Sequence, residues 1–225
     1  MATKQLEKRQ KKQAGGAAPG RAAKRPARVE APYHHGSLHE ALLKAAETIL
    51  ERDGLSGLTL RAAAREAGVS HAAPTHHFGD MTGLLSELAA AGFRKFGAMM
   101  GAAAETEASA GDRMDAMGEA YVAFAREHPS MFLLMFRSER LDPARPVLHE
   151  AMQNAFGMLM RGVSERRGPV PQGSALSVLA EIVRAWSMVH GFAMLMIDHR
   201  LDQMLSHLPE GMDASDLLRA MIRGK

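Results

Sequence analysis

The residues of this chain best suited to chemistry lie between positions 70 and 78. Two alanines there, Ala72 and Ala73, are small enough to let a helix backbone approach base edges or a thymine methyl group. Beside them stand side chains that can hydrogen-bond to bases or phosphates: His71, Thr75 and His76. This combination fits a helix that lies in a DNA groove. A plain surface helix with alanines is the alternative reading of the same residues.

Two short helices joined by a sharp turn, over residues 59–78, would position these side chains. Thr59 is a suitable N-cap for the first helix, whose inward face follows helical spacing at Leu60, Ala63, Ala64 and Ala67. Gly68 ends that helix, because glycine takes the left-handed conformation there without steric cost. Ser70 can cap the second helix. Since proline in a helix interior costs about 3 kcal/mol, Pro74 predicts a start at residue 70 or 71, with an end near residue 78.

Helices on both sides complete a compact bundle. Upstream, a capping box that opens at Ser37 predicts a helix to about residue 52, where Gly54 stops it. Downstream, Asp80 is a candidate cap for a longer helix over residues 81–99. The sequence therefore predicts three helices followed by a fourth that leads away from them.

The run from His35 to about Phe96 resembles the tetracycline-repressor (TetR/AcrR) family of bacterial transcription regulators. The resemblance rests on the helix end at Asp53-Gly54, on Leu58-Thr59-Leu60, on Ala67-Gly68-Val69-Ser70 at the turn, and on His77-Phe78 closing the second helix. The C-terminal half resembles a subgroup named for a Trp-His-Gly motif, through His128-Pro129, Met135-Phe136 and Trp186-Ser187-Met188-Val189-His190-Gly191. Together these stretches cover most of the chain after residue 33.

The resemblance and the helical periodicity both imply an all-α fold. An N-terminal three-helix bundle with a helix-turn-helix is expected over residues 33–80, and a C-terminal helical domain for ligand binding and dimerisation over residues 81–225, with helix 81–99 connecting them. The implied function is a ligand-responsive repressor, released from a palindromic double-stranded DNA operator by a small, largely apolar effector, and needing no cofactor. The candidate DNA-binding residues are Thr59, Arg61, Ser70, His71, Ala72, Ala73, Thr75, His76 and His77.

Two positions depart from the family pattern. The family usually has a tyrosine where this chain has Thr75, and a lysine or arginine where it has Met81, and both family residues typically touch phosphates. A threonine hydroxyl can still donate a hydrogen bond to a phosphate. The strength and register of DNA contact therefore need not follow the family pattern.

Positive charge is concentrated at the N-terminus. Residues 1–32 contain nine Lys or Arg residues and two Glu residues, whereas the whole chain carries only +3, so the remainder is net acidic. Because these 32 residues contain few large apolar side chains, we expect a disordered basic tail. The tail could follow the phosphate backbone or enter a minor groove, or it could simply aid solubility.

Histidines replace fixed positive charge in the predicted DNA-binding domain. Six occur in it, at positions 34, 35, 39, 71, 76 and 77. A nearby phosphate favours protonated histidine, so DNA affinity is expected to strengthen as pH falls from about 8 to 6. Their spacing matches no familiar zinc motif, and no metal site is predicted. His77 is expected to be packed or to contact a phosphate.

The C-terminal half is rich in methionine and aromatic residues, which form apolar surfaces that can remould around a ligand. Helices are predicted over residues 112–128, 131–136, 147–167, 174–199 and 214–222. An ordinary helical core is the alternative for any single methionine, and packing or a buried hydrogen bond is the alternative for Trp186 and His190. With the family resemblance, the candidate ligand-binding residues are Phe124, Met131, Met135, Phe156, Trp186 and His190.

The resemblance places the dimer interface on helices 147–167 and 174–199. Two recognition helices related by a two-fold axis can occupy successive major grooves about 34 to 36 Å apart. The expected mechanism is a two-state switch in which the effector favours a different spacing, with helix 81–99 as the lever.

Composition and the absence of known motifs argue against several other classes of function. The chain has no cysteine, which excludes disulfides and thiol chemistry. No nucleophile elbow, phosphate loop or dinucleotide fingerprint is present, so an enzyme is not expected. No signal peptide is visible and no apolar run reaches the roughly 18 residues of a membrane span, so a cytoplasmic protein is expected. A structural helical adaptor without DNA affinity remains the third alternative.

Overall fold

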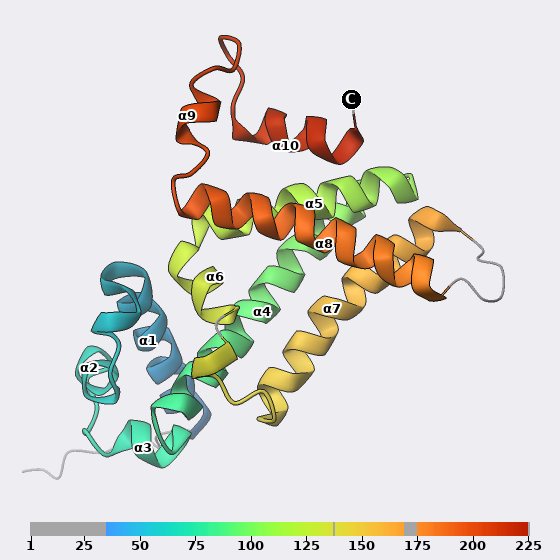
Figure 1. Cartoon of the computed structure of the whole chain (residues 1–225). Helices are drawn as coiled ribbons and strands as arrows, with labels where there is room; N and C mark the ends of the chain where they lie inside the picture. Colours follow the sequence, from blue (N-terminus) through green and yellow to red (C-terminus); the bar gives the residue numbers. More distant parts are fainter. Residues whose placement is uncertain (1–34, 137, 169–174, 225) are drawn as a thin grey trace, which may run out of the picture. The chain divides into compact units, whose positions relative to one another are not determined.

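The computed structural model describes residues 35–136, 138–168 and 175–224 of the chain. Every regular element in these ranges is helical, and they contain no strand, which confirms the all-α prediction. The predicted basic tail, residues 1–32, lies outside the described residues. Figure 1 shows how the helices are arranged.

The first three helices are α1 (His35–Gly57), α2 (Leu60–Glu66) and α3 (Ala73–Phe78). Gly54 interrupts the helical path of α1 with a φ of 69°, as expected for a stop at this glycine. The Thr59 hydroxyl accepts a hydrogen bond of 3.0 Å from the Ala62 N–H, so the predicted cap of α2 is confirmed. Gly68, with a φ of 67°, turns the chain toward α3.

Two predicted helix starts were wrong. Helix α1 already includes His35, so Ser37 lies inside its first turn and does not open it. Helix α3 begins at Ala73 and has no side-chain cap, so Ser70 does not cap it; instead the Ser70 carbonyl accepts a 3.0 Å bond from the Ala73 N–H in a turn. Proline lacks an N–H and fits only the first helical turn, and Pro74 occupies that turn.

Helix α4 (Met81–Glu105) packs against α1 and α3 near its start and against α5 and α7 along the rest of its length. The Asp80 carboxylate caps it by accepting a 2.8 Å bond from the Gly83 N–H, as predicted. The helix extends beyond the predicted end at residue 99, since the alanines at positions 102–104 are strong helix formers.

The C-terminal half contains seven further elements: α5 (Ala110–Glu127), α6 (Pro129–Met135), the 3-10 helix η1 (Ser138–Arg140), α7 (Pro146–Arg167), α8 (Ala175–Ile197), α9 (Asp202–Leu205) and α10 (Ala214–Arg223). The sequence did not predict η1 or α9. Helix α5 begins two residues before the predicted start at residue 112, because the Ser109 hydroxyl caps it by accepting a 3.0 Å bond from the Asp112 N–H.

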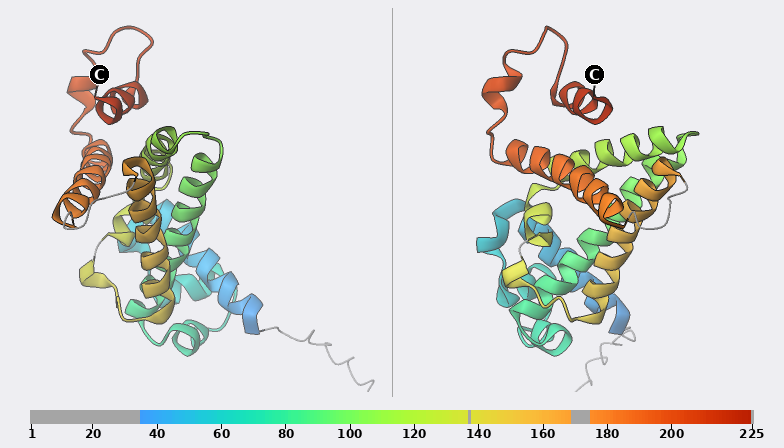
Figure 2. Two further views of the ribbon diagram at one scale, coloured as in Figure 1. Left: turned by 90° about the vertical axis from the view of Figure 1, so that its right-hand side faces the viewer. Right: turned by 45° about the vertical axis from the view of Figure 1, so that its right-hand side comes forward.

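Figures 1 and 2 show α7 running beside α4, while α8 lies along α5. The core between these helices is formed mainly by aromatic and methionine side chains, including Phe96, Phe124, Met131 and Phe132. Helix α10 packs on α5 through the buried Leu218. The helices thus enclose a space whose walls come from α4, α5, α7 and α8.

Helix α8 is unusual in its exposure. Among the described helices, it alone is long and apolar enough to cross a membrane by length and composition, and only 22% of the tested window is buried. Leu176, Leu179 and Val183 repeat every three or four residues and are 81%, 52% and 56% exposed. An apolar stripe of this kind needs a covering surface.

Candidate nucleic-acid interface and ligand cavity

One face of α3 points to solvent, and we call Ala72, Thr75 and His76 the α3 face. These residues are spaced i, i+3 and i+4, and all three are exposed. Pro74 and Phe78 are buried on the opposite side and fix the helix to the bundle. The structure therefore presents a small residue, a hydroxyl and an imidazole together on the surface.

The other predicted DNA-binding residues surround this face. Ser70 and His71 are exposed in the preceding turn, and Thr59 and Arg61 are exposed at the start of α2. Ala73 and His77 differ, because both are only partly exposed. The His77 ring lies 5.9 Å from the His39 ring of α1, centre to centre, so His77 belongs to the packing beneath the surface.

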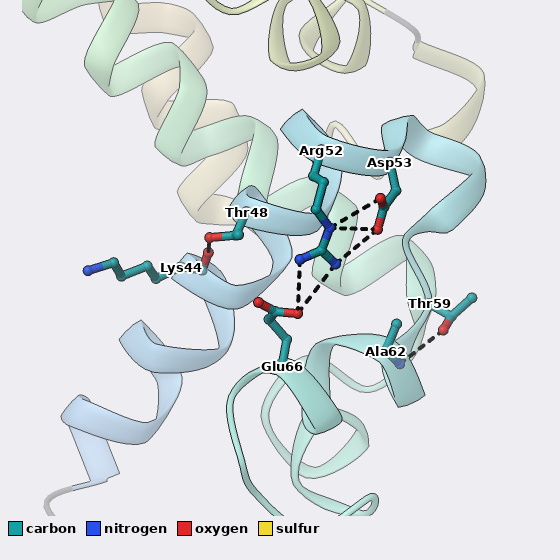
Figure 3. A network of polar contacts seen from close by, with 7 residues as sticks. All are labelled: Lys44, Thr48, Arg52, Asp53, Thr59, Ala62 and Glu66. Carbon is teal, nitrogen blue, oxygen red and sulfur yellow. Dashed lines mark hydrogen bonds and ion pairs between the residues drawn. The ribbon is translucent and has the colours of Figure 1, made fainter.

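An arginine connects α1 to α2 (Figure 3). Arg52 donates hydrogen bonds to Asp53 at 2.9 Å and to Glu66 at 3.4 Å. The hydrogen bond from Arg52 lowers the pKa of the Asp53 carboxyl, and the two carboxylates raise the pKa of Arg52. The charge of Arg52 is thus compensated, and the other exposed cations in the described part of the bundle are Lys44, Arg61 and Arg65.

No three His, Asp or Glu side chains come together as a metal site within residues 35–136, 138–168 and 175–224. The two histidine rings of α3 lie 5.5 Å apart, centre to centre; His76 is exposed to solvent, and His77 also contacts the ring of His39 on α1.

A cavity of about 540 Å³ lies among α4, α5, α7 and α8. Its volume falls in the range of small-molecule sites. Three of the predicted ligand-binding residues line it: Met135, Phe156 and Trp186. Phe124 and Met131 are 1% and 2% exposed and lie in the core outside the lining. His190 does not line the cavity either, but it contacts a residue that does.

That residue is Tyr121, which the sequence analysis did not single out. Its hydroxyl accepts a 3.3 Å bond from the Trp186 indole N–H and lies 2.8 Å from Nδ1 of His190. Since the indole N–H can only donate, the tyrosine hydrogen is available for His190. Burial raises the pKa of Tyr121 and lowers the pKa of His190, so this triad is neutral at pH 7.

Sequence reasoning also missed one charged lining residue, Arg166, and two residues of the segment before α7, Leu141 and Pro143. Arg166 looks like an ordinary cation in the last turn of a helix. Arg166 reaches the cavity because α5, α7 and α10 pack together, and no short-range pattern in the sequence predicts that packing.

The segment that carries Leu141 and Pro143 also contacts α4. The Asp142 N–H donates a 2.8 Å bond to the hydroxyl of Ser86, which is fully buried. A few residues on, Arg145 donates from Nε to the Glu87 carboxylate at 3.1 Å. The cavity wall and the start of α4 are therefore held together by hydrogen bonds from Asp142 and Arg145.

Glu87 continues this chain of contacts to α3. Its second carboxylate oxygen lies 2.5 Å from Nε2 of His39 on α1. The His39 ring in turn lies 5.0 Å from the Phe78 ring and 5.9 Å from the His77 ring, both on α3. We call Arg145, Glu87 and His39 the Glu87 bridge, which joins the cavity segment to α3.

Two family models match the chain. Residues 42–88 match bacterial regulatory proteins of the tetR family, and residues 114–223 match the tetracyclin repressor-like C-terminal domain. No curated protein is significantly similar to the sequence.

Several solved structures are similar to the whole described fold. A protein of unknown function from Rhodococcus sp. RHA1 is 36% identical, with 87% of this chain and 96% of that chain covered and a TM-score of 0.70. A putative tetR family transcription regulator from Shewanella sp. PV-4 is 18% identical, with 82% and 95% covered and a TM-score of 0.58. The transcriptional regulator FadR from Bacillus subtilis, solved with stearoyl-CoA, is 14% identical, with 82% and 96% covered and a TM-score of 0.61. The last two show the fold alone.

The lowered pKa of His190 makes its contribution to stability depend on pH. The unfolded chain takes up a proton near the ordinary value of 6.5 while folded His190 resists it, so the free energy of unfolding should fall as pH drops below about 6.5. We expect His190→Asn, which cannot take up this proton, to lose less thermal stability between pH 7.5 and 5.5 than the original chain. An equal loss in both proteins, measured by circular dichroism, would contradict this assignment.

Proposed function

The chain belongs to the TetR family of bacterial transcription regulators, and we propose that it is a repressor released from a palindromic operator by a small, largely apolar effector. The observation that carries the proposal is the α3 face, a solvent-directed surface of Ala72, Thr75 and His76 on a helix anchored from behind. Membership of this family also makes the chain a regulator and not an enzyme.

The proposed contacts with DNA fall into two classes, contacts with base edges and contacts with phosphates. The α3 face is suited to base edges, because Ala72 permits close approach and Thr75 and His76 hydrogen-bond. Lys44, Arg61 and Arg65 are suited to phosphates, which fix register but carry no sequence information. The described bundle has few exposed cations, so phosphate contacts should supply less of the affinity than in a strongly basic domain.

The α3 face is tested with an operator selected from random duplexes. We expect the selected sites to be palindromic. Thr75→Ala combined with His76→Ala should weaken binding by about thirtyfold or more, since each of the two lost base contacts is worth about 1–3 kcal/mol. Fluorescence anisotropy measures the affinity. His207→Ala, an exposed histidine distant in sequence, serves as the control and should bind as the original chain does. Unchanged affinity of the double variant would show that α3 does not contact the bases of the operator.

The apolar stripe of α8 supports a dimer. Leu176, Leu179 and Val183 are exposed on α8, and Val147 and Phe156 are 41% and 47% exposed on α7. A second copy that packs on these helices would cover the stripe, and a two-fold axis would pair the two α3 faces for a palindrome. This also gives the apolar composition of α8 a role in a soluble assembly.

We expect Leu179→Asp with Val183→Asp to convert a dimer into a monomer at micromolar concentration, because a buried unpaired carboxylate is strongly unfavourable. Sedimentation velocity measures the mass. Met204→Asp, at a methionine 58% exposed on α9, is the matched control and should remain dimeric. A dimeric double variant would place the interface elsewhere.

The proposed switch couples the cavity to the α3 face. FadR from Bacillus subtilis, which shares the fold, binds stearoyl-CoA, and the cavity among α4, α5, α7 and α8 offers this chain an effector site. An effector that favours a different arrangement of the segment 141–145 would displace Glu87 through its contact with Arg145. Glu87 lies on α4 and contacts His39 of α1, whose ring packs against α3. By linkage, DNA must then alter the cavity in return.

The reciprocal effect can be measured without an effector, because Trp186 is the single tryptophan of the chain and lines the cavity. We expect operator DNA to change Trp186 emission, and Glu87→Gln to reduce this change at saturating DNA and to weaken operator affinity about fivefold.

The control is Glu47→Gln, which removes another contact between α1 and α4, the Glu47–Lys95 ion pair, without touching the cavity segment. It should keep the full change in emission. Equal responses from Glu87→Gln and the original chain would exclude the Glu87 bridge as the connection.

A further inference from the structure

We propose that the effector is an anionic amphiphile whose carboxylate binds at Arg166 while its apolar body fills the cavity. This inference rests on the proposed function, because it takes the cavity among α4, α5, α7 and α8 as the effector site. It adds the chemical class of the ligand and the residue that selects it.

Among the described lining residues, Arg166 alone carries a full charge at neutral pH. The other polar lining groups already satisfy one another: Trp186 bonds to Tyr121 at 3.3 Å, and Gln153 lies 2.8 Å from His149. Apart from these groups and Arg166, the walls that a ligand meets are apolar.

Arg166 shares its carboxylate partner with a second arginine. Asp115 is only 8% exposed and faces two arginines, with Arg166 Nη1 at 2.9 Å and Arg223 Nε at 3.7 Å. Of the neighbouring ion pairs, Arg113 pairs with Glu165, whereas Arg219 pairs with both Glu119 and Asp216. Asp115 is therefore shared between two guanidinium groups and compensates neither of them completely, which leaves Arg166 able to bind a further carboxylate.

The guanidinium of Arg166 has the capacity for a second anion. Its contact with Asp115 uses Nη1, and the described residues provide no hydrogen-bond partner for its other N–H groups. A guanidinium offers five donors in a planar fork that matches a carboxylate. The Arg166 side chain is also 41% exposed, so a charged head group bound there keeps part of its hydration.

The shape of the cavity suits an extended body. Its lining follows α7 from His149 to Arg166, which corresponds to about 25 Å of helix at 1.5 Å per residue. Between these ends the walls are methionine and aromatic side chains such as Met114, Met117 and Phe156. Burial of an alkyl chain against such walls is favourable by about 0.8 kcal/mol per methylene group.

The test compares three probes with one ten-carbon tail: decanoate, 1-decanol and decylamine. Each is titrated into the full-length chain, and quenching of Trp186 reports entry into the cavity. We expect decanoate to bind about tenfold more tightly than 1-decanol, and decylamine to bind most weakly. Equal binding of decanoate and 1-decanol, or preference for decylamine, would overturn the assignment.

Three variants link the preference to Arg166. Arg166→Met should bring decanoate and 1-decanol within about twofold of one another. Asp115→Asn removes the carboxylate that faces Arg166 and should tighten decanoate about threefold without changing 1-decanol. This second variant keeps the test informative if Arg166→Met fails to fold. Arg161→Met, at an exposed position of the same helix outside the lining, should bind all three probes as the original chain does. A preference for decanoate that survives in Arg166→Met would contradict the role of this arginine.

The outcomes separate this inference from the proposed function. If 1-decanol binds as well as decanoate and either one releases operator DNA, the switch stands and the carboxylate preference is wrong. If none of the probes quenches Trp186 while operator binding is intact, the ligand class is wrong and the regulator remains. If decanoate binds with the expected preference but the chain binds no operator, the proposed function fails and the ligand assignment stands.

Discussion

The burial of α4 on both of its sides is the constraint on which the other contacts depend. Leu84, Leu85 and Leu88 are buried where α4 meets α1 and α3, and Phe93 and Phe96 are buried where it meets the cavity. A Cβ atom on Gly83 would lie 2.0 Å from the Phe78 carbonyl oxygen, so α3 sits against α4 without spare room. Because packed interfaces shift between discrete arrangements and do not deform continuously, a displacement of α4 cannot leave α3 where it was.

Much of the N-terminal bundle was predictable because its signals are local. The hydroxyl of Thr59, the glycine at position 68 and the carboxylate of Asp80 each act on backbone groups within three residues, and each was found in the predicted role. The matches of residues 42–88 and 114–223 to family models likewise confirm a family that was recognised from short motifs. The start of α3 was missed because two requirements competed, a cap at Ser70 and a first turn at Pro74, and the geometry of the turn decided between them.

The cavity was less predictable, because its lining depends on how distant helices meet. Phe124 and Tyr121 are one helical turn apart on α5, yet only Tyr121 lines the cavity, and the choice depends on the rotation of α5 against α4 and α8. Periodicity identifies an apolar face, but it does not say which part of that face meets another helix and which meets a void. Arg166 was missed for the same reason, since its partner Asp115 lies 51 residues earlier in the chain.

Phe156 and Trp186 lie both in the cavity wall and on the exposed side of α7 and α8, so they connect ligand binding to dimer formation. Their ring centres lie 6.5 Å apart, both rings line the cavity, and they are 47% and 39% exposed on the side of α7 and α8. In the proposed dimer the same two rings would form part of the cavity wall and part of the surface that the partner covers. A ligand body that shifts either ring then changes the shape of the interface, so dimer strength and ligand affinity must depend on each other. In this arrangement the head group at Arg166 selects the ligand, whereas the apolar body beside Trp186 transmits its presence.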